Sequence, residues 1–130
     1  MLQPQALGLP AFFADVFNNT VQNNILLIDT KGIILAINPA FTNFFGHQPE
    51  DIVGKNISIL FTPEDREKGL PEKELGSVLS TGQGSDNNYL VAADNSKIWV
   101  SGELSQNLAD GRRVVAVVAG VAHDLSCRSS

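Results

Sequence analysis

Apolar residues recur along the chain at two spacings, one typical of helices and the other typical of strands. Near the start, apolar residues follow Pro10 at helical spacing as far as the pair Asn18-Asn19, which predicts a short helix. The residues of its apolar face are Phe12, Phe13, Val16 and Phe17. A face this rich in aromatic side chains has to cover either the domain's own sheet or another subunit.

Two nearly continuous apolar runs follow, at residues 25–28 and 33–37, on either side of a turn that ends at Gly32. Both runs are rich in β-branched residues and predict a hairpin. Because polar residues hardly interrupt them, the sheet is expected to be covered on one face and partly on the other.

Two later helices have clear boundaries in the sequence. Asn38-Pro39 combines a good N-cap with a good first helical residue, and Gly46 is expected to end that helix. The other helix is predicted to begin at Pro71 and to end at Gly82. Its apolar stripe consists of Leu75, Val78 and Leu79. Gly76 inside this helix costs about 1 kcal/mol relative to alanine, so either close packing on the sheet or room for a ligand has to offset it.

Three strands are predicted after this helix. Residues 89–93 and 97–104 are joined by Asp94-Asn95-Ser96, where Asn tolerates a left-handed backbone. Asp110-Gly111, a strong hairpin signal, leads into the last strand at residues 112–122. The order of helices and strands predicts an α+β domain with a five-stranded antiparallel sheet and its helices on one side.

Composition narrows the classes of function. A chain of 130 residues predicts one domain, and 14 acidic residues against nine basic ones give a net charge of −5. This balance argues against non-specific nucleic-acid binding and against a polybasic membrane contact. The single cysteine, Cys127, excludes an internal disulfide and a zinc site with two thiolates. The longest apolar run, residues 114–122, is too short to span a bilayer, so we expect a cytoplasmic protein.

The ionisable residues do not form a recognisable catalytic set. His47 and His123 are the only imidazoles, and His47 is expected to be a solvated turn residue. A small enzyme with an apolar pocket would need a desolvated carboxylate that faces the pocket. Every acid instead falls in a turn, at a helix start or in the charged segment 64–68, so we expect neither catalysis nor a metal site.

Several stretches, taken together and in this order, resemble the PAS family of sensory domains. The first two, Ile25 to Ala40 and Phe45 to Lys55, are similar to the family's opening hairpin and to its turn-and-helix signature. Phe61 to Gly82 is similar to its connecting segment. Tyr89 to Ser126, which includes Trp99 and ends in Asp124-Leu125-Ser126, is similar to the last three strands and the terminal Asp-Ile-Thr motif.

The resemblance implies a PAS fold in which short helices cover one face of the sheet and an amphipathic helix flanks it. It divides the chain into a lead-in with that helix at residues 1–19, a PAS domain at 20–126 and a tail at 127–130 that leads to an output region. It implies a non-catalytic sensory domain, most often part of a two-component sensor histidine kinase. Such a domain binds a small ligand or a partner and relays a conformational change through its flanking helices. A ligand-free homodimerisation module is the alternative.

The resemblance also limits the cofactor. Flavin-thiol photosensors of this family carry a cysteine in an Asn-Cys-Arg motif, and no cysteine precedes Cys127. Oxygen sensors place an axial histidine on the connecting helix, and residues 66–82 contain none. Both chemistries are therefore disfavoured. A domain without a cofactor is favoured, and a non-covalent flavin stays open because it has no diagnostic residue.

A ligand, if there is one, is expected between the helices and the sheet, although a core filled by side chains is an equal alternative. Tyr89 and Trp99 would supply its polar handles. The predicted lining is Leu27, Ile37, Leu60, Leu75, Val78, Leu79, Tyr89, Val91, Trp99 and Val115. Asp124 and Ser126 are predicted to relay the signal to the output domain. A homodimer is predicted to form through Phe12, Phe13, Val16 and Phe17.

Overall fold

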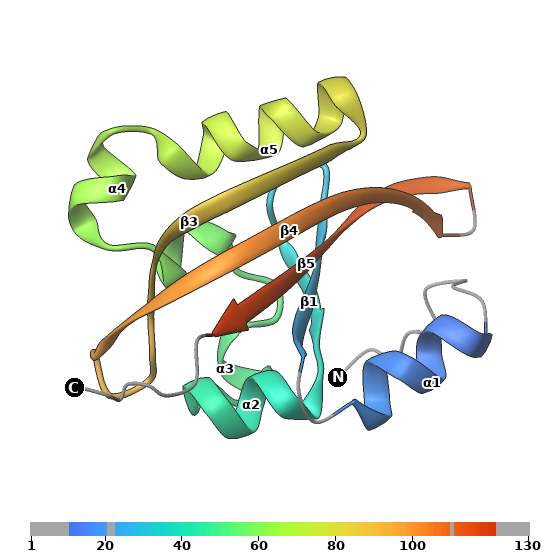
Figure 1. Ribbon diagram of the computed structural model, residues 1–130, viewed down its shortest axis with the longest axis horizontal. Helices are drawn as coiled ribbons and strands as arrows, with labels where there is room; N and C mark the ends of the chain where they lie inside the picture. The colour runs from blue at the N-terminus through green and yellow to red at the C-terminus, as the bar shows by residue number, and fades with distance from the viewer. Residues whose placement is uncertain (1–10, 21–22, 110, 122–130) are drawn as a thin grey trace.

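The structure, a computed structural model, describes residues 11–20, 23–109 and 111–121. A helix, α1, precedes a hairpin of strands β1 and β2, and four α-helices and a 3₁₀ helix, η2, connect that hairpin to strands β3, β4 and β5 (Figure 1). The elements are α1 Ala11–Asn19, β1 Asn24–Asp29, β2 Ile34–Ile37, α2 Pro39–Phe45, α3 Pro49–Ile52, η2 Ile57–Leu60, α4 Pro63–Glu67, α5 Leu70–Thr81, β3 Gln83–Val91, β4 Lys97–Ala109 and β5 Arg112–Val121.

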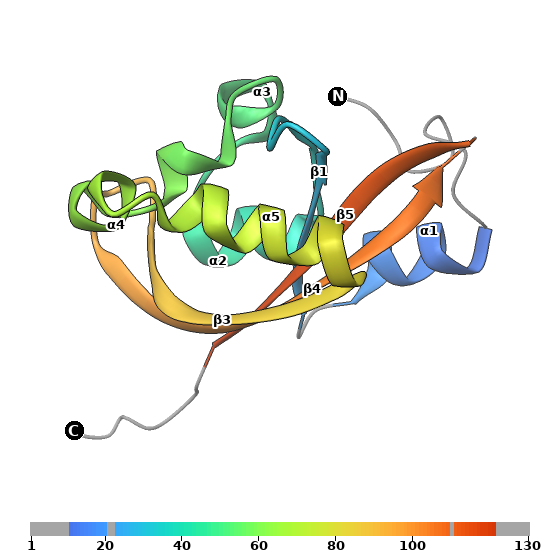
Figure 2. The same ribbon diagram turned by 90° about the horizontal axis from the view of Figure 1, so that it is seen from above.

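The strands form one antiparallel sheet in the order β2-β1-β5-β4-β3. Strand β5 lies between the two hairpins: Leu27 of β1 pairs with Ala116, and Leu104 of β4 pairs with Val117. The prediction of an α+β fold with a five-stranded antiparallel sheet is thus confirmed. Helix α5 runs along β3, as Figures 1 and 2 show from two directions.

The predicted ends of α2 are confirmed by its caps. The side-chain oxygen of Asn38 accepts hydrogen bonds from the backbone N–H groups of Phe41, at 2.9 Å, and Ile25, at 3.0 Å. Its Nδ2 donates to the carbonyl of Asn23 at 2.9 Å, so one buried side chain joins the start of α2 to β1. Gly46 ends the helix with φ +83°, a left-handed conformation that other residues adopt at a cost.

Apolar side chains gather on both faces of the sheet. The inner face packs against α2, α3, η2 and α5, and contains the larger cluster, including Leu26, Ile37 and Val78. The outer face has a smaller cluster of Phe17, Ile25, Leu27, Ala36, Ala109, Val114 and Ala116. Phe17 is 2% exposed, so α1 covers this chain's own sheet through that side chain.

Two local expectations were wrong. Strand β3 begins at Gln83 rather than at Tyr89, because the polar stretch before Tyr89 pairs with β4, from Gln83 opposite Ser105 onwards. Gly76 is exposed, and a Cβ built on it would meet nothing within 4 Å, so it neither packs on the sheet nor makes room for a ligand.

Candidate functional site

A small internal cavity lies between α5, η2 and the inner face of the sheet. The space that a water-sized sphere can occupy inside it is about 20 Å³. That is enough for about one water molecule. The cavity is lined by Leu26, Ile57, Phe61, Glu74, Leu90, Val100, Gly102, Leu104, Val117 and Ala119.

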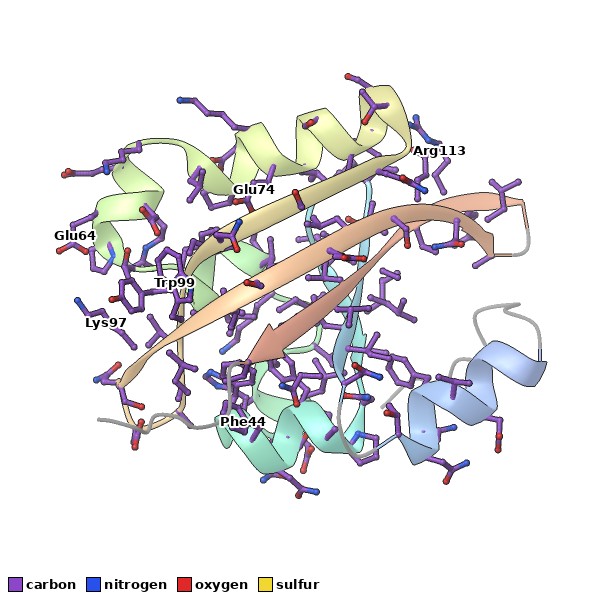
Figure 3. The ribbon with its side chains drawn as sticks, in the orientation of Figure 1. Phe44, Glu64, Glu74, Lys97, Trp99 and Arg113 are labelled. Carbon is purple, nitrogen blue, oxygen red and sulfur yellow. The ribbon has the colours of Figure 1, made fainter. Side chains whose placement is uncertain are left out.

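Glu74 is the one ionisable residue among those that line the cavity. It lies three residues after the buried Pro71 and four before the buried Val78, so it shares the face of α5 that packs on the sheet. Figure 3 shows it on α5 above strand β3. We expected no carboxylate to face an apolar pocket, but the half-buried side chain of Glu74 lines this cavity.

Asn88 places a second polar group on the inner face of β3. It is 4% exposed, lies directly opposite Val100 and is two residues from Leu90, and both of these apolar residues line the cavity. Its Nδ2 donates to the carbonyl of Tyr89 at 3.1 Å, but its Oδ1 accepts no hydrogen bond from any residue that the structure describes. A buried acceptor without a donor costs about 1–3 kcal/mol, which favours a donor other than the described residues, such as a water molecule.

A solvent-open groove of about 350 Å³ runs between α5 and the edge strand β3. Its floor and walls comprise Leu70, Lys73, Glu74, Ser77, Gly84, Ser85, Asn87 and Leu104. Glu74 and Leu104 line both the groove and the internal cavity. These two side chains therefore separate the cavity from the groove.

None of the ten predicted lining residues lines this cavity. Six of them belong to the inner cluster or pack against it, and the other four lie on the other side of the sheet. Ile37, Leu60, Val78 and Val115 are buried in the inner cluster, and Leu75 and Leu79 pack against it. Leu27 instead belongs to the outer cluster. Tyr89 and Trp99 are 40% and 50% exposed, and Val91 alternates with the inward-facing Leu90, so these three lie on the other side of their strands.

Tyr89 and Trp99 are therefore not polar handles inside the domain. They pair directly across β3 and β4, with ring centroids 5.1 Å apart and ring planes at 79°. The Lys97 ammonium lies 5.2 Å from the centre of the Tyr89 ring. Figure 3 shows Trp99 and Lys97 at the same end of β4. This is a cross-strand aromatic pair with a cation–π contact, which stabilises the hairpin.

Some of the predicted signalling and dimer-interface residues lie outside the part of the chain that the structure describes. Asp124 and Ser126 lie outside the described residues, as do the side chains of Phe12 and Phe13. Of the other two residues of the predicted dimer interface, Val16 is 36% exposed and Phe17 is packed inside the chain.

The residues around the cavity do not fit a haem. No histidine, cysteine, methionine or tyrosine is among them, and the space is far smaller than a porphyrin. His47 is not the solvated turn residue that we expected, because it is half-buried and its Nε2 lies 2.9 Å from the carbonyl oxygen of Val91. Within the described part of the chain, no group of three or more His, Cys, Asp or Glu could hold a metal ion.

Glu74 and Asn88 are the site residues that sequence reasoning missed, and each had a signal. Glu74 follows Pro71 by three residues and precedes Val78 by four, the spacing of a buried stripe. Asn88 precedes Leu90 by two, and a strand extended backwards from Leu90 puts both on one face.

Comparison with known proteins assigns the family. The profile of the PAS domain family matches residues 22–126. Two curated relatives align with part of the chain: Two-component system protein A of Emericella nidulans, 32% identical over 77 residues or 59% of this chain, and Oxygen sensor protein DosP of Escherichia coli, 30% identical over 105 residues or 75% of this chain. The matches span only 11% and 13% of the lengths of those two proteins.

Solved structures agree with this assignment. A PAS domain from Colwellia psychrerythraea has a TM-score of 0.72 at 16% identity, covering 85% of this chain and 94% of that one. The PAS-B domain of Drosophila melanogaster Cycle with bound ethylene glycol has a TM-score of 0.65 at 19% identity, covering 76% and 99%. The antiparallel sheet with its helix-covered inner face is thus the fold of these PAS domains. The chain belongs to the PAS domain family.

Within the described ranges, no helix has both the length and the apolar character needed to cross a bilayer.

Proposed function

We propose that this chain is a non-catalytic sensory domain that binds a small ligand between α5 and the sheet. The observation that carries the proposal is the internal cavity, with a half-buried acid in its lining. Asn88, which pairs with the lining residue Val100, has a buried acceptor with no donor among the described residues. Cycle PAS-B, which has the same fold, has been solved with bound ethylene glycol. The relatives named a two-component protein and an oxygen sensor support a cytoplasmic place in a two-component sensor histidine kinase.

The position of the cavity is suited to the relay of a conformational change. Its lining comes from β1, β3, β4, β5, α5 and η2, and includes Leu26 and Leu90 of the two different hairpins. A ligand that contacts both hairpins and α5 favours one of their relative arrangements, which shifts the population of states. We propose that Asp124 and Ser126, which follow β5 in the sequence, pass this shift to an output domain.

The cavity supports reception rather than catalysis. General acid–base chemistry needs an ionisable group within reach of a substrate, and Glu74 is the one such residue in the lining.

Xenon tests whether the cavity admits a ligand, because it binds in apolar spaces without hydrogen bonds. We expect xenon pressure to shift the amide NMR signals of β4 and β5 residues that line the cavity. Ala119→Val fills the space and should abolish these shifts, since Ala119 is 1% exposed and lines the cavity. Ala116→Val is the matched control on the outer face of the same strand and should leave them intact. Absence of xenon shifts in the unaltered protein would contradict ligand binding.

The alternative, a ligand-free homodimer that packs through α1, has its own test. Val16 is exposed on α1, whereas Phe17 is buried, so Val16→Glu changes the surface of the helix without entering the core. Light scattering after size-exclusion chromatography should show a dimer for the unaltered chain and a monomer for the variant if α1 forms the interface. An unchanged dimer would place the interface elsewhere.

A further inference from the structure

The two edges of the sheet differ in how their backbone groups are used. At the β2 edge, the N–H of Ile34 donates to the carbonyl of Lys55 at 2.8 Å, so the chain after α3 covers this edge. At the β3 edge, Phe61 forms an isolated bridge with Leu90. In the described part of the chain, no backbone segment pairs with the β3 edge over residues 84–88. An unpaired edge is a template on which another extended chain can add a strand.

Ser85 and Asn87 direct their backbone groups toward this open edge. The N–H of Gln106 donates to the carbonyl of Gly82 at 2.9 Å, so Gly82 faces β4. Successive residues of an antiparallel strand alternate between facing the partner strand and facing away from it. Because β3 pairs with β4 without a shift of register from Gln83 to Val91, its odd-numbered residues face away from β4. No hydrogen bond among the described residues uses the backbone N–H or carbonyl of Ser85 or Asn87.

The usual protections of an edge strand are missing from this part of β3. Natural edge strands are commonly protected by lysine, proline or a bulge. Residues 83–88 contain neither lysine nor proline, with Asp86 as their one charged residue, and no bulge interrupts their pairing with β4. The side chain of Asn87 lies toward β4, because its Oδ1 accepts a hydrogen bond from the Ser101 hydroxyl at 2.9 Å. It therefore does not cross the edge.

The groove between α5 and β3 offers side-chain contacts beside this edge, and Figure 2 shows α5 alongside β3. Gly84 has no side chain, so the apolar Leu104 of β4 lines the groove together with Leu70 of α5. Lys73 is exposed in the same groove and has no ion-pair partner in the described ranges, whereas Glu74 already has an interaction of its own. Leu70 and Lys73 are about 4.5 Å apart along the axis of α5, and alternate residues of an extended chain are about 6.6 Å apart. Two alternate side chains of an added strand can therefore contact one of these residues each.

We propose that the free edge of β3 binds an extended segment of a partner protein, which adds a sixth strand to the five-stranded sheet. The backbone groups of Ser85 and Asn87 hydrogen-bond to this segment. On the side that faces α5, the segment carries an apolar residue against Leu70 and Leu104 and an acidic residue beside Lys73. The inference does not depend on the ligand-binding function proposed above, because it needs no ligand in the internal cavity.

A second copy of this chain fits the edge less well than a single extended segment. Two-fold antiparallel pairing of two β3 strands would place them about 4.8 Å apart, with both α5 helices on the same face. Helix α5 packs closely over β3, since a Cβ on Gly84 would lie 3.0 Å from Cγ2 of Val78. The two copies of α5 would then lie closer than the 8–10 Å that packed helices require.

NMR titration with the peptide acetyl-Thr-Asp-Thr-Leu-Thr-Asp-Thr-amide tests the added strand, because its Asp and Leu side chains share one face when it is extended. We expect binding to protect the amides of Ser85 and Asn87 from hydrogen exchange. N-methylation of one alternate set of peptide amides should abolish binding, and N-methylation of the other set should not, since one set faces β3. Equal effects of the two sets, or no binding of the unmodified peptide, would overturn the proposal.

A variant of the protein tests the same hydrogen bonds from the other side. Ser85→Pro removes the outward N–H and leaves a peptide carbonyl without a donor, so we expect binding at least about fivefold weaker. Ser85→Ala is the matched control, because it keeps the N–H and should bind like the unaltered protein. The amide signals of β4 and β5 report whether Ser85→Pro stays folded, and the N-methylated peptides decide the matter if it does not. Equal binding by the folded variants would contradict an added strand.

Lys73→Glu tests the charge of the partner segment. The unaltered protein should bind the Asp peptide about two- to fivefold more tightly than the same peptide with Lys in both Asp positions, and Lys73→Glu should reverse this preference. Lys68→Glu is the matched control, since Lys68 is exposed but does not line the groove. An unchanged preference in Lys73→Glu would overturn the acidic chemistry of the partner.

Protein concentration distinguishes a partner protein from a second copy. Without peptide, the exchange rates of the Ser85 and Asn87 amides should be the same at low and high protein concentration. Protection that rises with protein concentration would show a second copy at this edge and would overturn the choice of partner.

Discussion

Gly76→Ala should stabilise the protein, because nothing in the structure uses the freedom of this glycine. It lies inside α5 with an exposed backbone, its φ is not in the left-handed region, and a Cβ there would meet no atom within 4 Å. Glycine in a helix interior is about 0.8–1.0 kcal/mol less favourable than alanine, and that is the full gain expected here. The corresponding rise in melting temperature is about 3–5 °C for a domain of this size.

At two other glycines near α5, the same substitution should lower the free energy of unfolding instead of raising it. Gly82 ends the helix at φ +89°, so Gly82→Ala should cost about 1–2 kcal/mol. Gly84 faces α5, and a Cβ on it would lie 3.0 Å from Cγ2 of Val78, so Gly84→Ala should cost about 1–3 kcal/mol through overpacking. One chemical change thus stabilises at one position and destabilises at two others.

Urea unfolding followed by circular dichroism measures the free energy of unfolding of all three variants. The midpoint should rise for Gly76→Ala and fall for the other two, with the same slope against urea. A neutral or destabilising Gly76→Ala would refute the reasoning, since it would show that the exposed face of α5 makes a contact or needs a flexibility that the structure does not contain.

Three further predictions concern hydrogen bonds. Asn38→Ala removes the cap of α2 and leaves the buried backbone N–H of Ile25 without its acceptor. The free energy of unfolding should therefore fall by about 2–4 kcal/mol in the same urea assay. A loss below about 1 kcal/mol would contradict the buried hydrogen-bond network. Arg113→Gln removes the hydrogen bond from Nη2 to the carbonyl of Leu79 at 2.8 Å, and the last turn of α5 should exchange its amide hydrogens faster while β5 stays protected. The Ser96 hydroxyl donates to Oδ1 of the exposed Asp94 at 2.6 Å, and this bond and the one from the Ser96 backbone N–H lower the pKa of Asp94. The turn therefore contributes stability above the unfolded-state pKa of this carboxyl group and loses it as the pH falls through the folded-state pKa. NMR titration should show that Ser96→Ala raises this pKa toward the ordinary aspartate value, and an unchanged pKa would contradict the assignment.

Elements with a local physical signal could be predicted from the sequence. Asn38 and Gly46 mark the ends of α2, and Gly82 marks the end of α5, because caps depend on a few neighbouring residues. The hairpin of β1 and β2 was equally visible, since its turn and both apolar runs are adjacent in the sequence.

The face of the sheet on which each strand side chain lies could not be predicted from such local signals. Strand β1 is apolar on both sides, so its sequence does not show that Leu27 faces outward while Leu26 faces inward. In β3 the large aromatic Tyr89 suggested an inward position, yet the neighbouring Asn88 takes that side. The alternation has a period of two, so one residue of error reverses the whole strand. Which residues of β3 face inward is set by the pairing of this strand with β4, and that pairing is not a local signal in the sequence of β3.

The strand order places a mechanical demand on β5. In the described sheet the two hairpins make no hydrogen bonds to each other, and each is bonded to β5 along one of its edges. Twisting one hairpin against the other must therefore shear the ladder on one side of this strand. Resistance to that shear is concentrated in residues 112–121, and substitutions there would alter how the halves of the domain move together even where each hairpin stays intact.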